Sequence, residues 1–206
     1  MAYNIFTKAV LVAGLAAGAA FSATAADNPK LMMGADASML GNTCAGCHGT
    51  DGASMGPAAP TIAGLSPDYF IEVMQGFASG DIPSTIMGRI AKGYSEDEIG
   101  TMAKYYAGKP FVKAKQSFDP ALADTGAKLH DRYCEKCHAE GGQSAEDDAG
   151  VLAGQWTPYV TWTLADYKAG DREATKKMKK KLQELMEREG SDGMTALLNF
   201  YASQQK

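Results

Sequence analysis

The segments NTCAGCHGTD (residues 42–51) and RYCEKCHAEG (residues 132–141) each contain the pattern Cys-x-x-Cys-His. The chain has 206 residues with only 4 cysteines and 3 histidines, so the two patterns hold every cysteine and all but one histidine. Cysteine and histidine side chains carry most metal, haem and thiol chemistry in proteins. The main chemistry of this chain is therefore expected at these two segments.

The two patterns are part of a longer internal repeat with an offset of 90 residues. At that offset IAGLSPDYF (62–70) aligns with LAGQWTPYV (152–160). Further along the chain the register slips by a few residues, and KYYAGK (104–109) matches NFYASQ (199–204). A self-match of this length indicates a tandem duplication.

The segment between the repeats, AGKPFVKAKQSFDP (107–120), has a proline near each end and no helical periodicity, which is typical of an extended linker. We therefore predict a first domain at 26–108, a linker at 109–119 and a second domain at 120–206. Domains of this size bury little apolar surface, and they commonly need a metal, a disulfide or a cofactor for stability.

The N-terminal residues predict export. Residues 1–25 combine Lys8 as the only charge, the apolar run AVLVAGLAAGAAF and an Ala-x-Ala ending, which is the pattern of a secretory signal peptide. We expect cleavage after Ala25, or alternatively after Ala26, and a periplasmic mature chain without a membrane span. A retained membrane anchor is the alternative, and it is disfavoured because the run is short and rich in Gly and Ala.

Charge and periodicity narrow the function classes further. The formal net charge of −4 argues against nucleic acid as a partner and weakly favours docking onto a basic patch of another protein. Apolar periodicity predicts an all-α chain without alternating strand segments. The predicted helices cover residues 35–43, 66–77, 95–108, 120–134, 157–170, 172–189 and 192–205.

Cys-x-x-Cys-His is the attachment sequence for c-type haem. Two cysteines one helical turn apart reach the porphyrin edge and form thioethers, which assigns Cys44 with Cys47, and Cys134 with Cys137, to two covalent haems. The adjacent histidines, His48 and His138, are then placed to bind iron. A zinc ribbon would use four thiolates without needing a His after each pair, and a dithiol redox site favours an alternating strand-and-helix context. Haem is therefore the favoured interpretation.

Each iron needs a sixth ligand or an open site, and methionine is the usual sixth ligand in electron-carrying c-type cytochromes. Met74, Met102, Met186 and Met194 lie on apolar helical stripes that favour the core, and Met55 follows His48 too closely. Met87 lies 39 residues after His48 and Met178 lies 40 residues after His138. The sequence favours Met87 and Met178.

Other residues carry weaker signals. His130 precedes Cys134 by one helical turn and aligns with Leu40, which favours a packed or surface role. The basic run from Arg172 to Lys181 fits a solvated helix face better than a docking patch for an acidic partner. Four aromatic side chains are expected to line the haem pockets: Tyr69, Trp156, Tyr159 and Trp162.

Several segments resemble one family closely. STIMGRIAKGYS (84–95), ALADTGAKLHDRYCEKCH (121–138), LAGQWTPY (152–159) and FYASQQ (200–205) are similar to the dihaem cytochrome subunit of flavocytochrome c sulfide dehydrogenase, within the tandem class I dihaem cytochromes c. This resemblance implies two class I cytochrome c domains, each wrapped around one haem. It also implies His/Met ligation, by His48 with Met87 and by His138 with Met178.

The resemblance also implies partners. A separate subunit carrying FAD would oxidise sulfide, and this chain would pass the electrons to a soluble acceptor cytochrome without being catalytic alone. Two other functions stay open on the residues. One is a free-standing dihaem carrier serving a terminal oxidase. The other is a haem enzyme such as a peroxidase, which would need one iron without its methionine.

Overall fold

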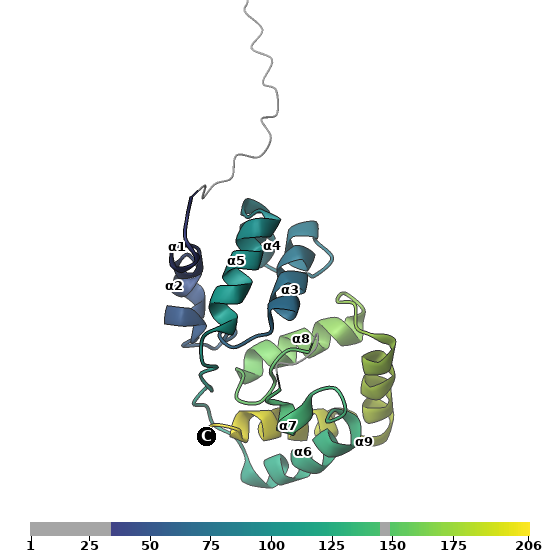
Figure 1. The fold of residues 1–206 in the computed structure, drawn as a ribbon. Helices are drawn as coiled ribbons and strands as arrows, with labels where there is room; N and C mark the ends of the chain where they lie inside the picture. The colour runs from purple at the N-terminus through teal and green to yellow at the C-terminus, as the bar shows by residue number, and fades with distance from the viewer. Residues whose placement is uncertain (1–33, 145–148) are drawn as a thin grey trace, which may run out of the picture.

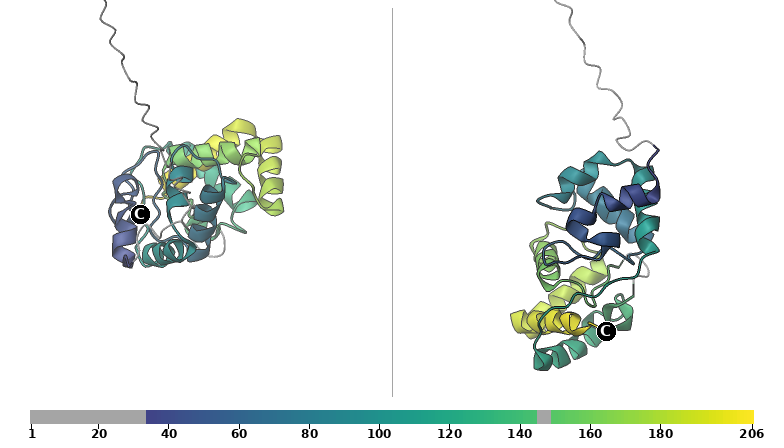
Figure 2. Two further views of the ribbon diagram at one scale, coloured as in Figure 1. Left: turned by 90° about the horizontal axis from the view of Figure 1, so that it is seen from above. Right: turned by 90° about the vertical axis from the view of Figure 1, so that its left-hand side faces the viewer.

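The structure, a computed structural model, describes residues 34–144 and 149–206, so the predicted signal peptide and its cleavage site lie outside the described residues. Within these two ranges the chain is helical and contains no strand. Two groups of helices, α1–α5 and α6–α9, form a first and a second half that lie against each other (Figures 1 and 2). No helix in the described ranges is long and apolar enough to cross a membrane.

The first half is built from short helices, three of which have side-chain N-caps. The Asp36 carboxylate accepts a hydrogen bond from the backbone N–H of Met39, and Ser66 caps the longest helix. The predicted capping box is present, with the Ser95 N–H donating to Glu98 Oε2 at 2.8 Å. The elements are α1 (Ala37–Asn42), α2 (Ala45–His48), η1 (Thr50–Gly52), α3 (Pro67–Ser79), α4 (Met87–Ile90), η2 (Ala91–Gly93) and α5 (Glu96–Ala107).

The second half follows the same plan with longer helices at its ends. Its elements are α6 (Pro120–Tyr133), α7 (Ala139–Gly142), α8 (Thr157–Ala169) and α9 (Lys176–Ser203). The sequence predicts two helices where α9 lies, and the chain is indeed broken there. Gly190 has φ 62° and ψ −153°, a conformation outside the helical region, so the axis of α9 changes direction (Figure 1).

The first and last helices of each half cross at close range. In the first half the Tyr106 hydroxyl donates to the Gly41 carbonyl at 2.6 Å, which joins α5 to α1. In the second half α6 packs along α9, and a Cβ on Gly126 would overlap the carbonyl of Ala196. Each crossing closes one hydrophobic core, so each half has a core of its own.

The duplication is visible in the backbone hydrogen bonds. The Gly52 carbonyl accepts from the N–H groups of Ile62 and Ala63, and the Gly142 carbonyl accepts in the same way 90 residues later, from Leu152 and Ala153. The two halves are therefore built around equivalent loops that fold back over the Cys-x-x-Cys-His segments.

The segment between α5 and α6 is helix-free and follows the boundary between the halves. The Ala114 N–H donates to the Gly154 carbonyl at 2.7 Å, and Gln116 donates to the carbonyl of Gln155 at 2.8 Å. Val151 of the second half is part of the core of the first half. The contact between the halves is thus formed by the connecting segment and by interlocking side chains.

Candidate haem centres

The first Cys-x-x-Cys-His segment forms a single helical turn. The carbonyl of Cys44 accepts from the N–H groups of Cys47 at 3.2 Å and His48 at 2.9 Å. The Cys44 side chain is half-buried and Cys47 is exposed, and neither forms a disulfide. This turn places both thiols and the imidazole on one short piece of backbone, as double thioether attachment requires.

The hydrogen bond of His48 fixes which ring nitrogen is available. His48 is 8% exposed, and its Nδ1 lies 2.8 Å from the carbonyl oxygen of Pro60. Because a carbonyl can only accept, Nδ1 must carry the proton and Nε2 keeps its lone pair for a metal. Burial lowers the pKa of His48, so the neutral, ligating form is favoured at neutral pH.

The second segment has the same turn with a different environment. The Cys134 carbonyl accepts from Cys137 at 3.1 Å and from His138 at 2.9 Å. Burial raises the pKa of the Cys134 thiol and lowers that of His138. The carbonyl of Gly150, the repeat counterpart of Pro60, partly offsets the lowering of the His138 pKa. The Nδ1 atom of His138 nevertheless lacks a hydrogen bond of good geometry.

The predicted methionine ligands occupy different settings. Met87 is the first residue of α4, is partly buried and packs against the core of the first half, as Cys44 does. Met178 lies in the first turn of α9, where its N–H is capped by Thr175, and it is partly buried among exposed lysines. The roles of Met87 and Met178 stay predictions.

The zinc alternative fits the geometry poorly. Within the described residues no three His, Cys, Asp or Glu side chains converge as metal ligands, although all four cysteines belong to that part of the chain. Each Cys pair instead stays with its own His on its own turn. The residues present fit two separate haems better than one shared zinc ion.

Known proteins resemble this chain over much of its length, although no family model matches it. Cytochrome c4 from Azotobacter vinelandii is 31% identical over 148 residues, which cover 63% of this chain and 69% of that relative. The thiosulfate dehydrogenase electron acceptor from Stutzerimonas stutzeri is 34% identical over 162 residues, covering 73% and 74% of the two chains. The chain belongs to the dihaem cytochrome c4-like family. It is accordingly a dihaem c-type electron-transfer protein.

Two further known proteins resemble this chain, one in its fold and one over part of its sequence. Reduced recombinant cytochrome c4 from Pseudomonas stutzeri superposes with a TM-score of 0.69 at 23% identity, covering 82% of this chain and 98% of that one. This confirms the predicted all-α fold of tandem class I cytochrome c domains. The cytochrome subunit of sulfide dehydrogenase from Chlorobaculum tepidum is 47% identical over 68 residues. That match covers 33% of this chain and less than two thirds, 61%, of the subunit.

A buried arginine lies between the halves of this cytochrome c4-like chain. Arg172 is 5% exposed, and its guanidinium carbon lies 5.0 Å from the ring centre of Tyr167. Burial raises the pKa of Tyr69, and the nearby Arg172 guanidinium offsets part of this rise. Tyr159 and Tyr167 of α8 lie close enough to Tyr69 to affect its titration as well. Tyr69 belongs to α3, which runs towards α8 (Figure 1), so the cluster bridges the two halves.

The surroundings of Arg172 fit a bound carboxylate. In the described part of the chain no Asp or Glu forms an ion pair with Arg172. An anionic partner lowers the cost of burying a cation, and the two propionate carboxylates of a haem have the required charge. The sequence grouped Arg172 with the exposed lysines of α9, and this was wrong. Arg172 differs from those lysines in its position: it directly follows the Gly170–Asp171 turn and precedes the start of α9.

His130 has the packed role, one of the two that the sequence predicted, and it is unavailable to iron. It is fully buried, and both of its ring nitrogens are engaged: Nδ1 lies 3.0 Å from the Tyr201 hydroxyl and Nε2 lies 2.6 Å from Glu135.

The two tryptophans occupy different settings. Trp156 bonds to the first half, with its indole N–H donating to the Ser54 carbonyl at 3.2 Å. Trp162 is 54% exposed, so it points largely to solvent.

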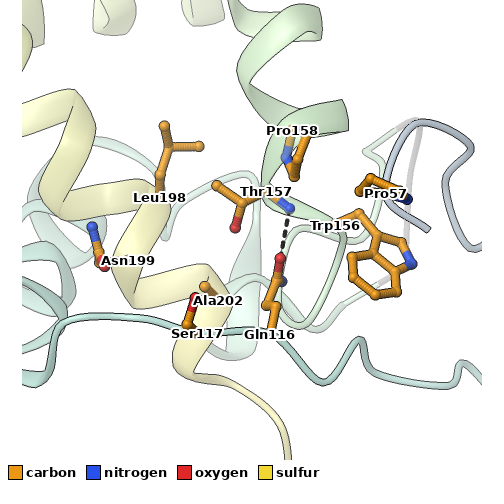
Figure 3. A pocket seen from close by; sticks show the side chains of 9 residues that line it. All are labelled: Pro57, Gln116, Ser117, Trp156, Thr157, Pro158, Leu198, Asn199 and Ala202. Carbon is orange, nitrogen blue, oxygen red and sulfur yellow. Dashed lines mark hydrogen bonds between the residues drawn. The ribbon is translucent and has the colours of Figure 1, made fainter. Parts of the chain in front are cut away.

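One pocket lies away from both Cys-x-x-Cys-His segments. It encloses about 340 Å³ where the connecting segment, the start of α8 and the end of α9 meet (Figure 3). Gln116 accepts there from the N–H of Thr157 at 2.9 Å, and Trp156 and Pro57 close one side. All of its lining side chains are uncharged, and we assign it no chemistry.

Proposed function

We propose that this chain is the periplasmic dihaem subunit of a sulfide dehydrogenase, receiving electrons from an FAD-containing subunit and passing them to a soluble acceptor cytochrome. The observation that carries the proposal is the pair of equivalent Cys-x-x-Cys-His turns, each with a histidine whose pKa is lowered by burial so that the neutral form is favoured. The 47% identity to a sulfide dehydrogenase cytochrome subunit supports the choice of partner. The domains would be residues 26–108 and 120–206, joined at 109–119.

In this proposal each half attaches and ligates one haem. Cys44 and Cys47 hold the first and Cys134 and Cys137 the second, with His48 and Met87, and His138 and Met178, on the two irons. When bound, each haem supplies a one-electron iron couple. The protein holds the histidines neutral, provides a soft thioether ligand that favours ferrous iron, and surrounds the site with apolar side chains that keep water away.

The exposed surface of the first half supports docking of a partner there. Met55 is 87% exposed, Met39 55% and Ile86 53%, which is unusual for large apolar side chains near a cofactor site. Along the sequence, Met39 and Met55 flank Cys47, and Ile86 directly precedes Met87. A flavoprotein that covered them would bring its donor to the first half.

The test is the flavin-to-haem ratio of the protein isolated gently from its native periplasm. One flavin for every two haems, together with a second and larger chain that reduces this subunit when sulfide is added, is the expected result. Haem without flavin would leave a free-standing dihaem carrier. A chain without haem would contradict the whole proposal.

A thiosulfate-oxidising partner is the second candidate. The acceptor from Stutzerimonas stutzeri is 34% identical and aligns with 73% of this chain, more than the sulfide dehydrogenase subunit does. The same preparation distinguishes the two candidates. Reduction of the haems by sulfide but not by thiosulfate supports the first, and the reverse result supports the second.

A further inference from the structure

The side chain of Gln155, in the second half, makes two hydrogen bonds to the loop that supports His48. The Thr61 N–H donates to Gln155 Oε1 at 2.9 Å, and Gln155 Nε2 donates to the Thr61 carbonyl at 2.9 Å. Both residues are buried, with Thr61 at 0% and Gln155 at 3% exposure. Water therefore does not compete for either hydrogen bond, and the two bonds together fix the Gln155 side chain against the Thr61 backbone.

The hydrogen bond from Thr61 acts on the acceptor of His48 because both belong to one peptide group. The N–H of Thr61 and the C=O of Pro60 are the two ends of the same planar unit. One end accepts from His48 Nδ1 at 2.8 Å and the other donates to Gln155 Oε1. Tilting this plane would weaken both bonds, and hydrogen bonds in such a chain polarise one another.

Gln155 is itself held in place. Its Oε1 also accepts from the N–H of Trp156 at 3.1 Å, and its backbone carbonyl accepts from Gln116 Nε2 at 2.8 Å. The side chain is therefore presented to Thr61 by the start of α8 and by the connecting segment.

The described part of the second half shows no equivalent arrangement. The repeat counterpart of Gln155 is Leu65, which has no hydrogen-bonding group. The counterpart of the Pro60–Thr61 peptide is Gly150–Val151, and there the first half supplies a packing contact, since a Cβ on Gly150 would lie 2.7 Å from the Tyr69 hydroxyl. His138 Nδ1 correspondingly lacks a hydrogen bond of good geometry.

We propose that Gln155 is a positioning residue through which the second half orients the hydrogen-bond acceptor of His48 and makes the two haem centres unequal. This rests on the proposed role of His48 as an iron ligand. A firm hydrogen bond from Nδ1–H raises the basicity of the imidazole and favours ferric iron, so it lowers the midpoint potential. The first haem is held at a lower potential than it would have without Gln155.

The test compares Gln155→Met with Trp156→Phe in the full-length holoprotein. Gln155→Met keeps the length of the side chain and removes both bonds to Thr61. Trp156→Phe removes a different bond between the halves, the one to the Ser54 carbonyl, and leaves the Pro60–Thr61 peptide alone. The potentials of the two haems are measured by redox titration and assigned with Met87→His, which changes only the first centre.

The expected result is an upward shift of the first haem potential in Gln155→Met, with the second haem unchanged and with neither haem shifted in Trp156→Phe. Unchanged potentials, equal shifts of both haems, or the same shift in both variants would overturn the proposal. Gln155→Leu, which copies the side chain of Leu65, serves as a second variant.

A measurement on the unmodified protein keeps the test independent of how the variants fold. In nuclear magnetic resonance spectra the amide proton of Thr61 and the ring Nδ1 proton of His48 should both exchange slowly with solvent. Rapid exchange of the Thr61 amide would overturn the proposal. A haem count of two per chain with unmoved potentials rejects this inference alone, whereas a chain without haem rejects the proposed function.

Discussion

His130 and Glu135 form a hydrogen-bonded pair with Nε2 and Oε2 2.6 Å apart, one residue fully buried and the other partly exposed. Glu135 lies between the two cysteines of the second motif, and it also accepts from the backbone N–H groups of Glu140 and Gly141. A single carboxylate thus joins α6 to the turn that follows His138. The hydrogen bond from His130, followed by that from Gly141, lowers the pKa of Glu135.

The first prediction concerns pH. Because the pKa of Glu135 is lower in the folded protein than in the unfolded chain, its contribution to the free energy of unfolding is present above the ordinary glutamate pKa and is lost as the pH falls through the lowered value. Glu135→Gln should therefore be less stable than the native protein at pH 7 and should converge with it in acid. Urea unfolding at a series of pH values measures this, and a pH-independent difference would contradict it.

The second prediction concerns Met87. Met87→Ala should leave both haems attached and open the sixth position of the first iron, so that the ferrous protein binds carbon monoxide at one haem per chain. Met74→Leu is the matched control, because Met74 is 5% exposed in the core of the first half and should leave carbon monoxide binding unchanged. Absorption spectra of the reduced proteins under carbon monoxide check it. No binding to Met87→Ala would show that the ligand assignment is wrong.

The third prediction concerns Arg172. A buried positive charge favours ferrous over ferric iron, so Arg172→Gln should lower a haem potential by some tens of millivolts, where about 59 mV corresponds to a tenfold change in a one-electron equilibrium. Arg188→Gln removes the same charge from an exposed position on α9 and should have little effect because solvent screens it. Redox titration of the two variants measures the difference. Equal shifts would argue against a propionate contact.

The fourth prediction concerns the helix crossing at Gly126. A Cβ there would overlap the backbone of Ala196, which cannot move without separating α6 from α9, so Gly126→Ala should cost about 1–3 kcal/mol of stability. Gly100→Ala is the control, because nothing lies within 4 Å of a Cβ at Gly100 in α5. That variant should gain about 0.5–1 kcal/mol from helix propensity. Chemical unfolding of both variants gives the comparison, and equal effects would contradict the crossing geometry.

The sequence by itself determined the features that depend on short stretches of chain. The two Cys-x-x-Cys-His turns, the Ser95 capping box and the helices α3, α5 and α6 follow from residue spacing within a few turns. Helix α8 follows from its alignment with α3 in the repeat. The repeat adds the equivalence of the two halves, because alignment at a fixed offset needs no coordinates. These signals are local hydrogen bonds and apolar periodicity, and both depend on residues that lie close together in the sequence.

The tertiary structure alone decided how the halves differ. Gln155 and Thr61 are 94 residues apart and Arg172 meets Tyr69 from the other half, so no local pattern predicts either contact. The same is true of His130, whose burial against Tyr201 depends on how α6 packs on α9. Duplicated sequences give two similar folds, but the surface where they meet gives each copy different neighbours. That difference in neighbours makes the hydrogen bonding of His48 and His138 unequal. Gln155 of the second half hydrogen-bonds the Pro60–Thr61 peptide, whereas Tyr69 of the first half packs against the counterpart Gly150–Val151 peptide.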